Sequence, residues 1–224
     1  MDVFTDPANV DVYVTGFLWI LRLTVASAVI ALVLGVVLAA MRVSPVPVLR
    51  AFGTGWVNIF RNTPLTLVIF FCYFGLFSTL GVSPSDDIEL NNFWLGVIGL
   101  SVYTAAFVCE AVRSGVNTVP AGQAEAARAI GMTFAQTLRM IVLPQAGRAV
   151  IAPLGSIFIA LAKNSTIVGT IGLMEASNAM KELINARGDA VIPIFLAFAG
   201  TFAIVLIPTG YLFGWLANRL AVKR

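Results

Sequence analysis

The sequence contains no histidine at all, and only 11% of its 224 residues carry a charged side chain. Without imidazole there is no histidine metal ligand, no histidine general base and no histidine proton relay. Charged residues make up about a quarter of an ordinary globular chain, so a chain with 59% hydrophobic residues cannot bury its apolar surface in one water-soluble core. The composition therefore indicates an integral membrane protein.

Cysteine is nearly absent as well, since Cys72 and Cys109 are the only two and both fall inside apolar runs. In such surroundings a thiol behaves as a small buried apolar group, and no neighbouring residues complete a metal-binding set. No nucleophile with an adjacent base and no pair of catalytic carboxylates stands out. We therefore expect no metal or cofactor bound by this chain, no catalytic residue, no enzyme activity and no nucleic-acid partner.

Long apolar runs recur along the chain, with the length of about 20 residues that a helix needs to cross ~30 Å of hydrocarbon. They lack the alternation of outer-membrane strands, so the sequence predicts an all-α integral membrane protein with one transmembrane domain, residues 1–224. The first 21 residues contain no Lys or Arg, unlike a signal peptide, and we expect Met1 to begin the mature protein. The five predicted spans are residues 14–41, 64–80, 93–112, 141–162 and 191–216.

Basic residues gather after the first, third and fifth predicted spans, where short loops rich in Lys and Arg stay cytoplasmic. The other side has Lys181 and Arg187, with Lys163 near the boundary. This distribution predicts an outside N-terminus and an inside C-terminus. The basic residues that follow these three spans are Arg42, Arg50, Arg61, Arg113, Arg128, Arg139, Arg219, Lys223 and Arg224.

Two features inside the predicted spans indicate helix packing. A small residue recurs at every fourth position of the first span, which lets a neighbouring backbone approach closely. Glu110 and Arg113 lie one helical turn apart near the cytoplasmic end of the third span, and we expect them to form a structural ion pair. The small residues of the stripe are Ser27, Ala31, Gly35 and Ala39.

Residues 120–144 are the least membrane-like long stretch of the chain and read as a helical hairpin. Pro120 suits the start of a helix, and the alanine-rich run that follows favours helix. Gly131 stands where a helix ends in a left-handed residue. The pair Thr133 and Gln136 has the spacing of a capping box that opens a second helix. We expect that second helix to end at Pro144.

The hairpin carries a family resemblance. Glu125-Ala126-Ala127, Gly131, Ile141 and Leu143-Pro144 are similar, at this spacing, to the EAA loop of ABC-importer permeases. The flanking segments "FRNTPLTLVIFFCYFGL" and "LAKNSTIVG" resemble the histidine, glutamine and glutamate group, and the likeness spans roughly residues 14–216. The resemblance implies the type I permease fold and a hairpin that couples to an ATPase. The coupling residues it implies are Gly122, Glu125, Ala126, Ala127, Gly131 and Pro144.

The chain contains no GxxxxGK[ST] phosphate loop, so ATP hydrolysis must occur on another chain. The resemblance implies an ATP-binding cassette ATPase dimer that holds ATP and Mg, and a second permease subunit, sister or identical. It also implies an extracytoplasmic amino-acid-binding protein and a multi-pass location in the lipid bilayer of a prokaryotic cytoplasmic (inner) membrane. The alternative for the hairpin is an interfacial helix that rests on lipid headgroups.

One polar cluster at membrane depth is formed by Arg61, Asn62 and Thr63, just before Pro64. A fixed cation beside the partially positive start of a helix can hold a carboxylate. The alternative is an interfacial arginine whose head reaches the lipid headgroups. We place this cluster on the substrate path.

A second cluster, Lys163, Asn164, Ser165 and Thr166, resembles a Lys-Asp/Asn-Ser/Thr-Ser/Thr signature that lies on the translocation path of the family. Permeases for cationic amino acids resemble the version with Asp, whereas here the residue is Asn164. An amide cannot neutralise a cation, whereas Lys163 and Arg61 favour an acidic substrate. We expect glutamate before aspartate, with glutamine or another polar amino acid as the alternative.

Two other classes compete with an ATP-driven permease. An ion-coupled secondary transporter needs carboxylates within its spans, and apart from Glu110 near one end no acidic residue lies within a predicted span, which argues against an ion relay. A channel subunit fits the composition alone and stays an alternative.

Overall fold

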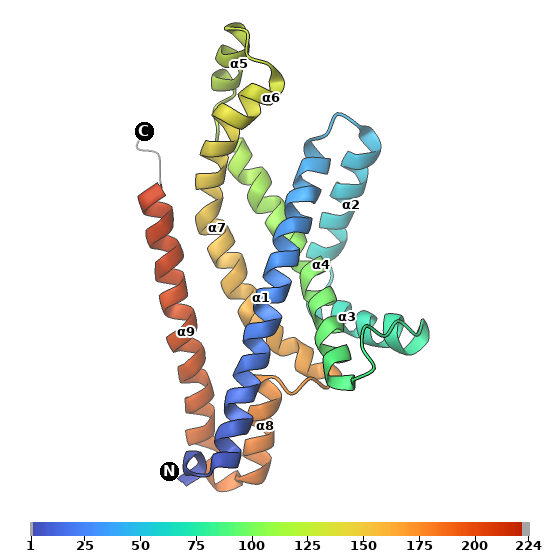
Figure 1. The fold of residues 1–224 in the computed structure, drawn as a ribbon, viewed down its shortest axis with the longest axis vertical. Helices are drawn as coiled ribbons and strands as arrows, with labels where there is room; N and C mark the ends of the chain where they lie inside the picture. The colour runs from blue at the N-terminus through green and yellow to red at the C-terminus, as the bar shows by residue number, and fades with distance from the viewer. Residues whose placement is uncertain (1, 221–224) are drawn as a thin grey trace.

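The computed structural model describes residues 2–220, which are helical with short connections and form no strand. Met1 and residues 221–224, among them Lys223 and Arg224, lie outside this range. Four long helices run along the molecule, with a small hairpin at one end and α8 beside the start of α1 at the other (Figure 1). The elements are η1 (Asp2–Thr5), α1 (Pro7–Val43), α2 (Pro47–Asn62), α3 (Leu65–Phe70), the π-helix η2 (Phe71–Thr79), α4 (Ile88–Asn117), α5 (Ala121–Ala129), α6 (Phe134–Thr137), the π-helix η3 (Leu138–Val142), α7 (Leu143–Asn164), η4 (Ser165–Ile171), α8 (Ala176–Ala186), η5 (Gly188–Ala190) and α9 (Val191–Leu220).

Helix α1 is longer than the apolar run inside it. Asp6 caps its start by accepting the N–H of Ala8 at 3.0 Å. Its 37 residues extend about 55 Å, so it reaches beyond the ~30 Å of hydrocarbon. The predicted stripe of small residues is buried against α4, where a Cβ on Gly35 would lie 2.5 Å from Val108. The prediction of a packing seam is confirmed.

Helices α2 and α3 form a bent pair with an angle of 108° between their axes. The chain turns at Thr63, whose backbone is extended because a residue before a proline avoids helical geometry. Figure 1 shows α3 pointing sideways, away from the long helices. Residues 64–80, the second predicted span, therefore form only one arm of this bent pair. Among the described residues, four helices can cross a membrane, and the bent pair makes a fifth if it crosses as one unit.

Helix α4 lies at the centre of the fold and packs against α1, α2, α3 and α7. Leu95, Leu100 and Cys109 are fully buried along it. By contrast, α9 buries only Ile194 and Phe198 and touches the bundle mainly along α7. The central helix therefore positions the polar residues of α2 and α7, while most of α9 is left for lipid or for another subunit.

At the end opposite the hairpin, a buried carboxylate joins η4 to α8. Glu175 caps α8 by accepting the N–H groups of Ser177 at 2.8 Å and Asn178 at 3.2 Å. Asn178 in turn donates to the carbonyl of Gly169 at 2.8 Å, and a Cβ on Gly169 would lie 2.2 Å from a Glu175 oxygen. Burial raises the pKa of Glu175 to about 7, in spite of the two N–H donors that favour the ionised form.

Candidate functional site

The first candidate site is the hairpin, and its turn forms as the sequence predicts. Helix α5 ends at Ala129, and Gly131 just after it has a φ of +91°, in the left-handed region that glycine adopts without strain. The N–H of Gly131 donates to the carbonyl of Arg128 at 3.0 Å, and the N–H of Met132 donates to that of Ala127 at 3.1 Å. These bonds fix the direction in which the chain leaves α5.

The second arm of the hairpin opens with the predicted capping box. Thr133 accepts the N–H of Gln136 at 3.3 Å, and the side chain of Gln136 accepts the N–H of Thr133 at 2.8 Å. Gln145 then donates to the side chain of Gln123 at 2.6 Å, which ties α5 to the start of α7. The hairpin is therefore a fixed unit.

The prediction that the second helix ends at Pro144 is wrong. Phe134–Ile171 is a single helical run, and Pro144 lies in the first turn of α7. Proline lacks an N–H and its ring pushes away the carbonyl four residues earlier, that of Met140. The helix responds by widening into the π-helix Leu138–Val142 instead of stopping. The hairpin is thereby continuous with α7.

The surface of the hairpin is exposed and partly apolar. Of the implied coupling residues, only Ala127 is buried, whereas Gly122, Glu125 and Ala126 are exposed. Two large apolar side chains beside the turn are open, Ile130 at 81% and Phe134 at 72%. Sequence reasoning missed these two, although their apolar character outside a predicted span was a signal. Apolar side chains this exposed can contact another protein or the lipid headgroups.

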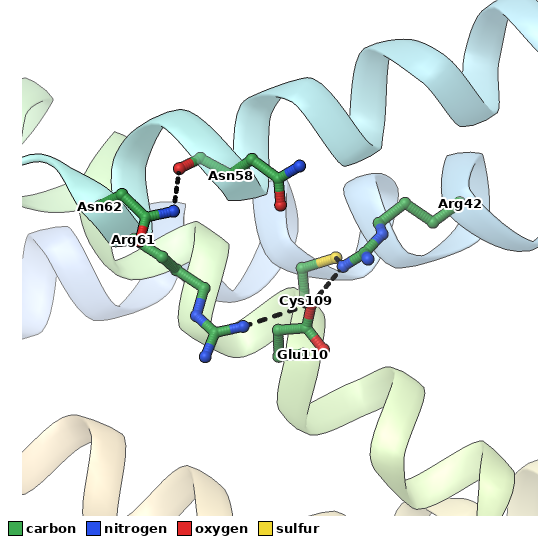
Figure 2. Close-up of polar contacts among 6 residues, drawn as sticks. All are labelled: Arg42, Asn58, Arg61, Asn62, Cys109 and Glu110. Atoms are coloured by element: carbon green, nitrogen blue, oxygen red, sulfur yellow. Dashed lines mark hydrogen bonds and ion pairs between the residues drawn. The ribbon is translucent and has the colours of Figure 1, made fainter.

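The second candidate site lies at the bend between α2 and α3. Arg61, at the end of α2, places its Nη1 atom 3.6 Å from an oxygen of Glu110 on α4 (Figure 2). The same oxygen accepts a hydrogen bond from Arg42 on α1. The predicted pair of Glu110 with Arg113 is therefore wrong, since no ion pair joins these two described residues. The other two members of the first cluster bond within α2, with Asn62 donating to Asn58 at 2.7 Å and Thr63 donating to Ile59 at 2.8 Å.

Arg42 is a site residue that the sequence did not reveal. It was predicted only as a cytoplasmic flank of the first span, yet its side chain is 9% exposed and reaches the Glu110 oxygen. No local pattern links Arg42 to a residue 68 positions away. Only the packing of α1 on α4 brings them together.

The second cluster is divided between two cavities. Asn164 lines a cavity of about 340 Å³ between α4 and α7, whereas Lys163 and Thr166 line another, of about 320 Å³, against α9. The hydroxyl of Ser165 donates to the carbonyl of Ala162 at 2.9 Å, and the hydroxyl of Thr166 donates to the carbonyl of Lys163 at 2.8 Å. The side chains of the neighbouring residues Lys163 and Asn164 therefore face different cavities.

Phe107 of α4, in contrast, lies beside Arg61 and also lines the cavity of Asn164. Phe107 lines the cavity with Asn164, and the Cζ atom of Arg61 lies 6.0 Å from the centre of its ring. Tyr103, Thr104 and Ser156 add hydroxyl groups to the cavity wall. This part of the site combines a cation, an amide and hydroxyls, which can hold a small polar molecule.

A broken apolar helix pair, a cavity between two long helices that holds a few polar side chains, and an exposed hairpin are features of membrane transport proteins. The chain belongs to the family described as "Binding-protein-dependent transport system inner membrane component", whose profile matches residues 31–222. It is therefore a multi-pass membrane component of such a transport system, located in the inner membrane.

Three known proteins are similar to it over nearly their whole length. The glutamate transport system permease protein GluC of Corynebacterium efficiens is 49% identical over 92% of this chain and 93% of that protein. The protein named "Probable glutamine ABC transporter permease protein GlnM" of Bacillus subtilis is 35% identical over 95% of this chain and 94% of its own. A crystal structure of an amino acid ABC transporter with histidines is similar with a TM-score of 0.86 and 25% identity, and covers 98% of this chain and 99% of the other.

Proposed function

We propose that this chain is the permease subunit of an ATP-driven importer that carries glutamate across the inner membrane by alternating access. The 49% identity to a glutamate permease supports the class of substrate. The observation that carries the proposal is the charge at the bend between α2 and α3. Two arginines share one carboxylate there, which leaves one positive charge in excess beside the cavity. A charged side chain at membrane depth is costly, so its presence there marks a candidate functional site.

Arg61 is the cation that meets the side-chain carboxylate of the substrate in this proposal. Its side chain is 48% exposed, and its neighbour Phe107 lines the cavity. Asn164 and the hydroxyls of Tyr103 and Thr104 supply neutral donors and acceptors for the amino-acid head. Lys163 faces the cavity against α9, so it contacts the substrate only if α9 moves. Ser165 has a structural role at the end of α7.

The hairpin is the site at which an ATP-binding cassette ATPase dimer, holding ATP and Mg, drives the cycle. Helix α7 has 22 residues and extends about 33 Å from Leu143 to Asn164. Because the hairpin continues into α7, a push on the hairpin moves Asn164 without an intervening hinge at Pro144. The face of α5 that docks on the ATPase consists of the exposed residues Gly122, Glu125 and Ala126.

The remaining parts of the assembly follow from the same proposal. A second permease subunit, sister or identical, covers the exposed face of the bundle and completes the path. An extracytoplasmic amino-acid-binding protein delivers the substrate at the end that carries α8. The N-terminus is then outside and the C-terminus inside, and residues 1–224 act as one transmembrane permease domain.

The proposal is tested by uptake into proteoliposomes that contain this chain, its second permease, the ATPase and the binding protein. We expect labelled glutamate to enter only with ATP, and unlabelled aspartate to compete with it. A hundredfold excess of unlabelled arginine should leave uptake unchanged. Equal competition by arginine would rule out an acidic substrate, and uptake driven by an ion gradient without ATP would point to a secondary transporter.

Glutamine is the second candidate substrate, because Asn164 is neutral and the chain is 35% identical to a permease named for glutamine. Arg61→Gln separates the two candidates. Glutamate uptake should fall at least tenfold relative to glutamine uptake, since the amide cannot neutralise a carboxylate. Arg50→Gln, the same exchange on the exposed face of α2, is the matched control and should change neither rate.

A further inference from the structure

Three ionised side chains from three different helices meet beside the proposed path. Arg42 comes from α1, Arg61 from α2 and Glu110 from α4, and the Nη1 atoms of both arginines approach the same oxygen of Glu110 (Figure 2). Sharing one carboxylate leaves each arginine incompletely neutralised. A site of this kind can exchange partners, because a second carboxylate that enters would satisfy the arginine that leaves.

The two arginines are held unequally. Arg42 is 9% exposed, forms the direct hydrogen bond to Glu110, and has Cys109 Sγ 4.0 Å from the same Nη1 atom. Arg61 is 48% exposed, lies 3.6 Å from the carboxylate oxygen, and has the ring of Phe107 as its other neighbour. An exposed ion pair contributes little, whereas separating a buried one leaves an uncompensated charge. Arg61 is therefore the arginine that can leave, and Arg42 keeps Glu110 paired when it does.

We propose that Glu110 is a displaceable counterion, a carboxylate of the protein that holds Arg61 in the empty path and yields it to the side-chain carboxylate of the substrate. This inference rests on the proposed function. It makes Glu110 a positioning residue that acts through Arg61, and Arg42 its fixed anchor. When Arg61 returns to Glu110, it helps to release the substrate. Competition between Glu110 and the substrate for Arg61 therefore lowers the affinity for glutamate and speeds its release.

The test removes the counterion Glu110 without leaving the buried Arg42 unpaired. Because Glu110→Gln alone leaves Arg42 unpaired and can impair folding, the decisive variant is Arg42→Gln/Glu110→Gln, which removes the buried pair together. Radiolabelled glutamate is bound to the purified permease–ATPase complex without binding protein, and uptake is measured in the complete system. We expect the dissociation constant to fall at least threefold and the maximal uptake rate to fall at least fivefold.

Two comparisons make the result decisive. Adding Arg61→Gln to the double variant should abolish the tighter binding, because the counterion acts only through Arg61. Glu89→Gln, on the exposed first turn of the same helix, should behave as the wild type. Unchanged or weaker glutamate binding in a folded Arg42→Gln/Glu110→Gln complex overturns the counterion role. If Arg61→Gln alone leaves glutamate binding and uptake intact, the acidic-substrate proposal itself fails.

Discussion

Glu175 shows how a single side chain can make stability depend on pH. It is fully buried, and the charge of Lys181, six residues further along the chain, favours its ionised form. Desolvation favours the neutral carboxyl and places its pKa at about 7. The folded protein therefore binds this proton more tightly than the unfolded chain does. The stability that Glu175 contributes is fully present below the ordinary pKa of 4.5 and is lost as the pH rises through about 7.

The matching prediction concerns Glu175→Gln, whose amide keeps an acceptor for the cap of α8. The difference in unfolding free energy between wild type and variant should change by about 2.5 kcal/mol between pH 5 and pH 8, with the wild type losing stability as the pH rises. Thermal melting of the detergent-solubilised complex across this range measures it. Parallel curves for wild type and variant would contradict the assignment.

At the residue scale, the sequence predicts what depends on neighbours along the chain. The cap formed by Thr133 and Gln136 and the left-handed Gly131 are both confirmed, because their partners lie within a few residues. The partner of Glu110 could not be predicted, because Arg42 is distant in the chain and close only through helix packing. Roles assigned to Arg61, Asn164 and the coupling residues stay predictions.

Among the helices, the second arm of the hairpin differs most from what the sequence predicts. The sequence predicts that the second hairpin helix ends at Pro144, yet the helix continues past it by widening into the π-helix Leu138–Val142. In the proposed mechanism the lever therefore extends into α7, which contains an interior proline, Pro153, before it reaches Asn164. The bend between α2 and α3 was signalled by Pro64, but its angle of 108° depends on tertiary packing and could not be predicted.

Gly131→Leu tests the hairpin as a lever. At a φ of +91° a side chain costs about 1–2 kcal/mol, and no atom outside the glycine's own neighbourhood lies within 4 Å to clash with it. The fold should survive, whereas the altered exit from α5 and the added side chain disturb docking. We expect glutamate uptake and substrate-stimulated ATP hydrolysis to fall more than tenfold while the subunits still co-purify.

Gly81→Leu is the matched control for this experiment. Gly81 also has a positive φ, +69°, and also has open space around it, but it lies after η2 rather than in the hairpin. Its variant carries the same kind of backbone strain and should retain most of the uptake. Normal transport by Gly131→Leu, or an equal loss in both variants, would count against a lever at this turn.

As a whole molecule, the chain leaves apolar surface uncovered at two places. Helix α9 is exposed along most of its length, and the hairpin carries the open apolar side chains of Ile130 and Phe134. The sequence predicted the all-helical fold class well, because hydrocarbon thickness fixes the length of each apolar run. The neighbours of these surfaces come from the family resemblance as expectations, because the residues of one chain do not specify what covers its exposed faces.

The proposed function depends above all on contact between the hairpin and an ATPase. Cys72 and Cys109 are buried, so Ala126→Cys introduces an exposed thiol on α5. A short bifunctional cross-linker applied to the active complex should join this residue to the ATPase subunit, with a yield that changes between nucleotide-free and ATP-bound states. Ser83→Cys, in the segment between η2 and α4, should give no such product. Absence of any ATPase cross-link from position 126 in every nucleotide state of a transport-competent complex would contradict the account.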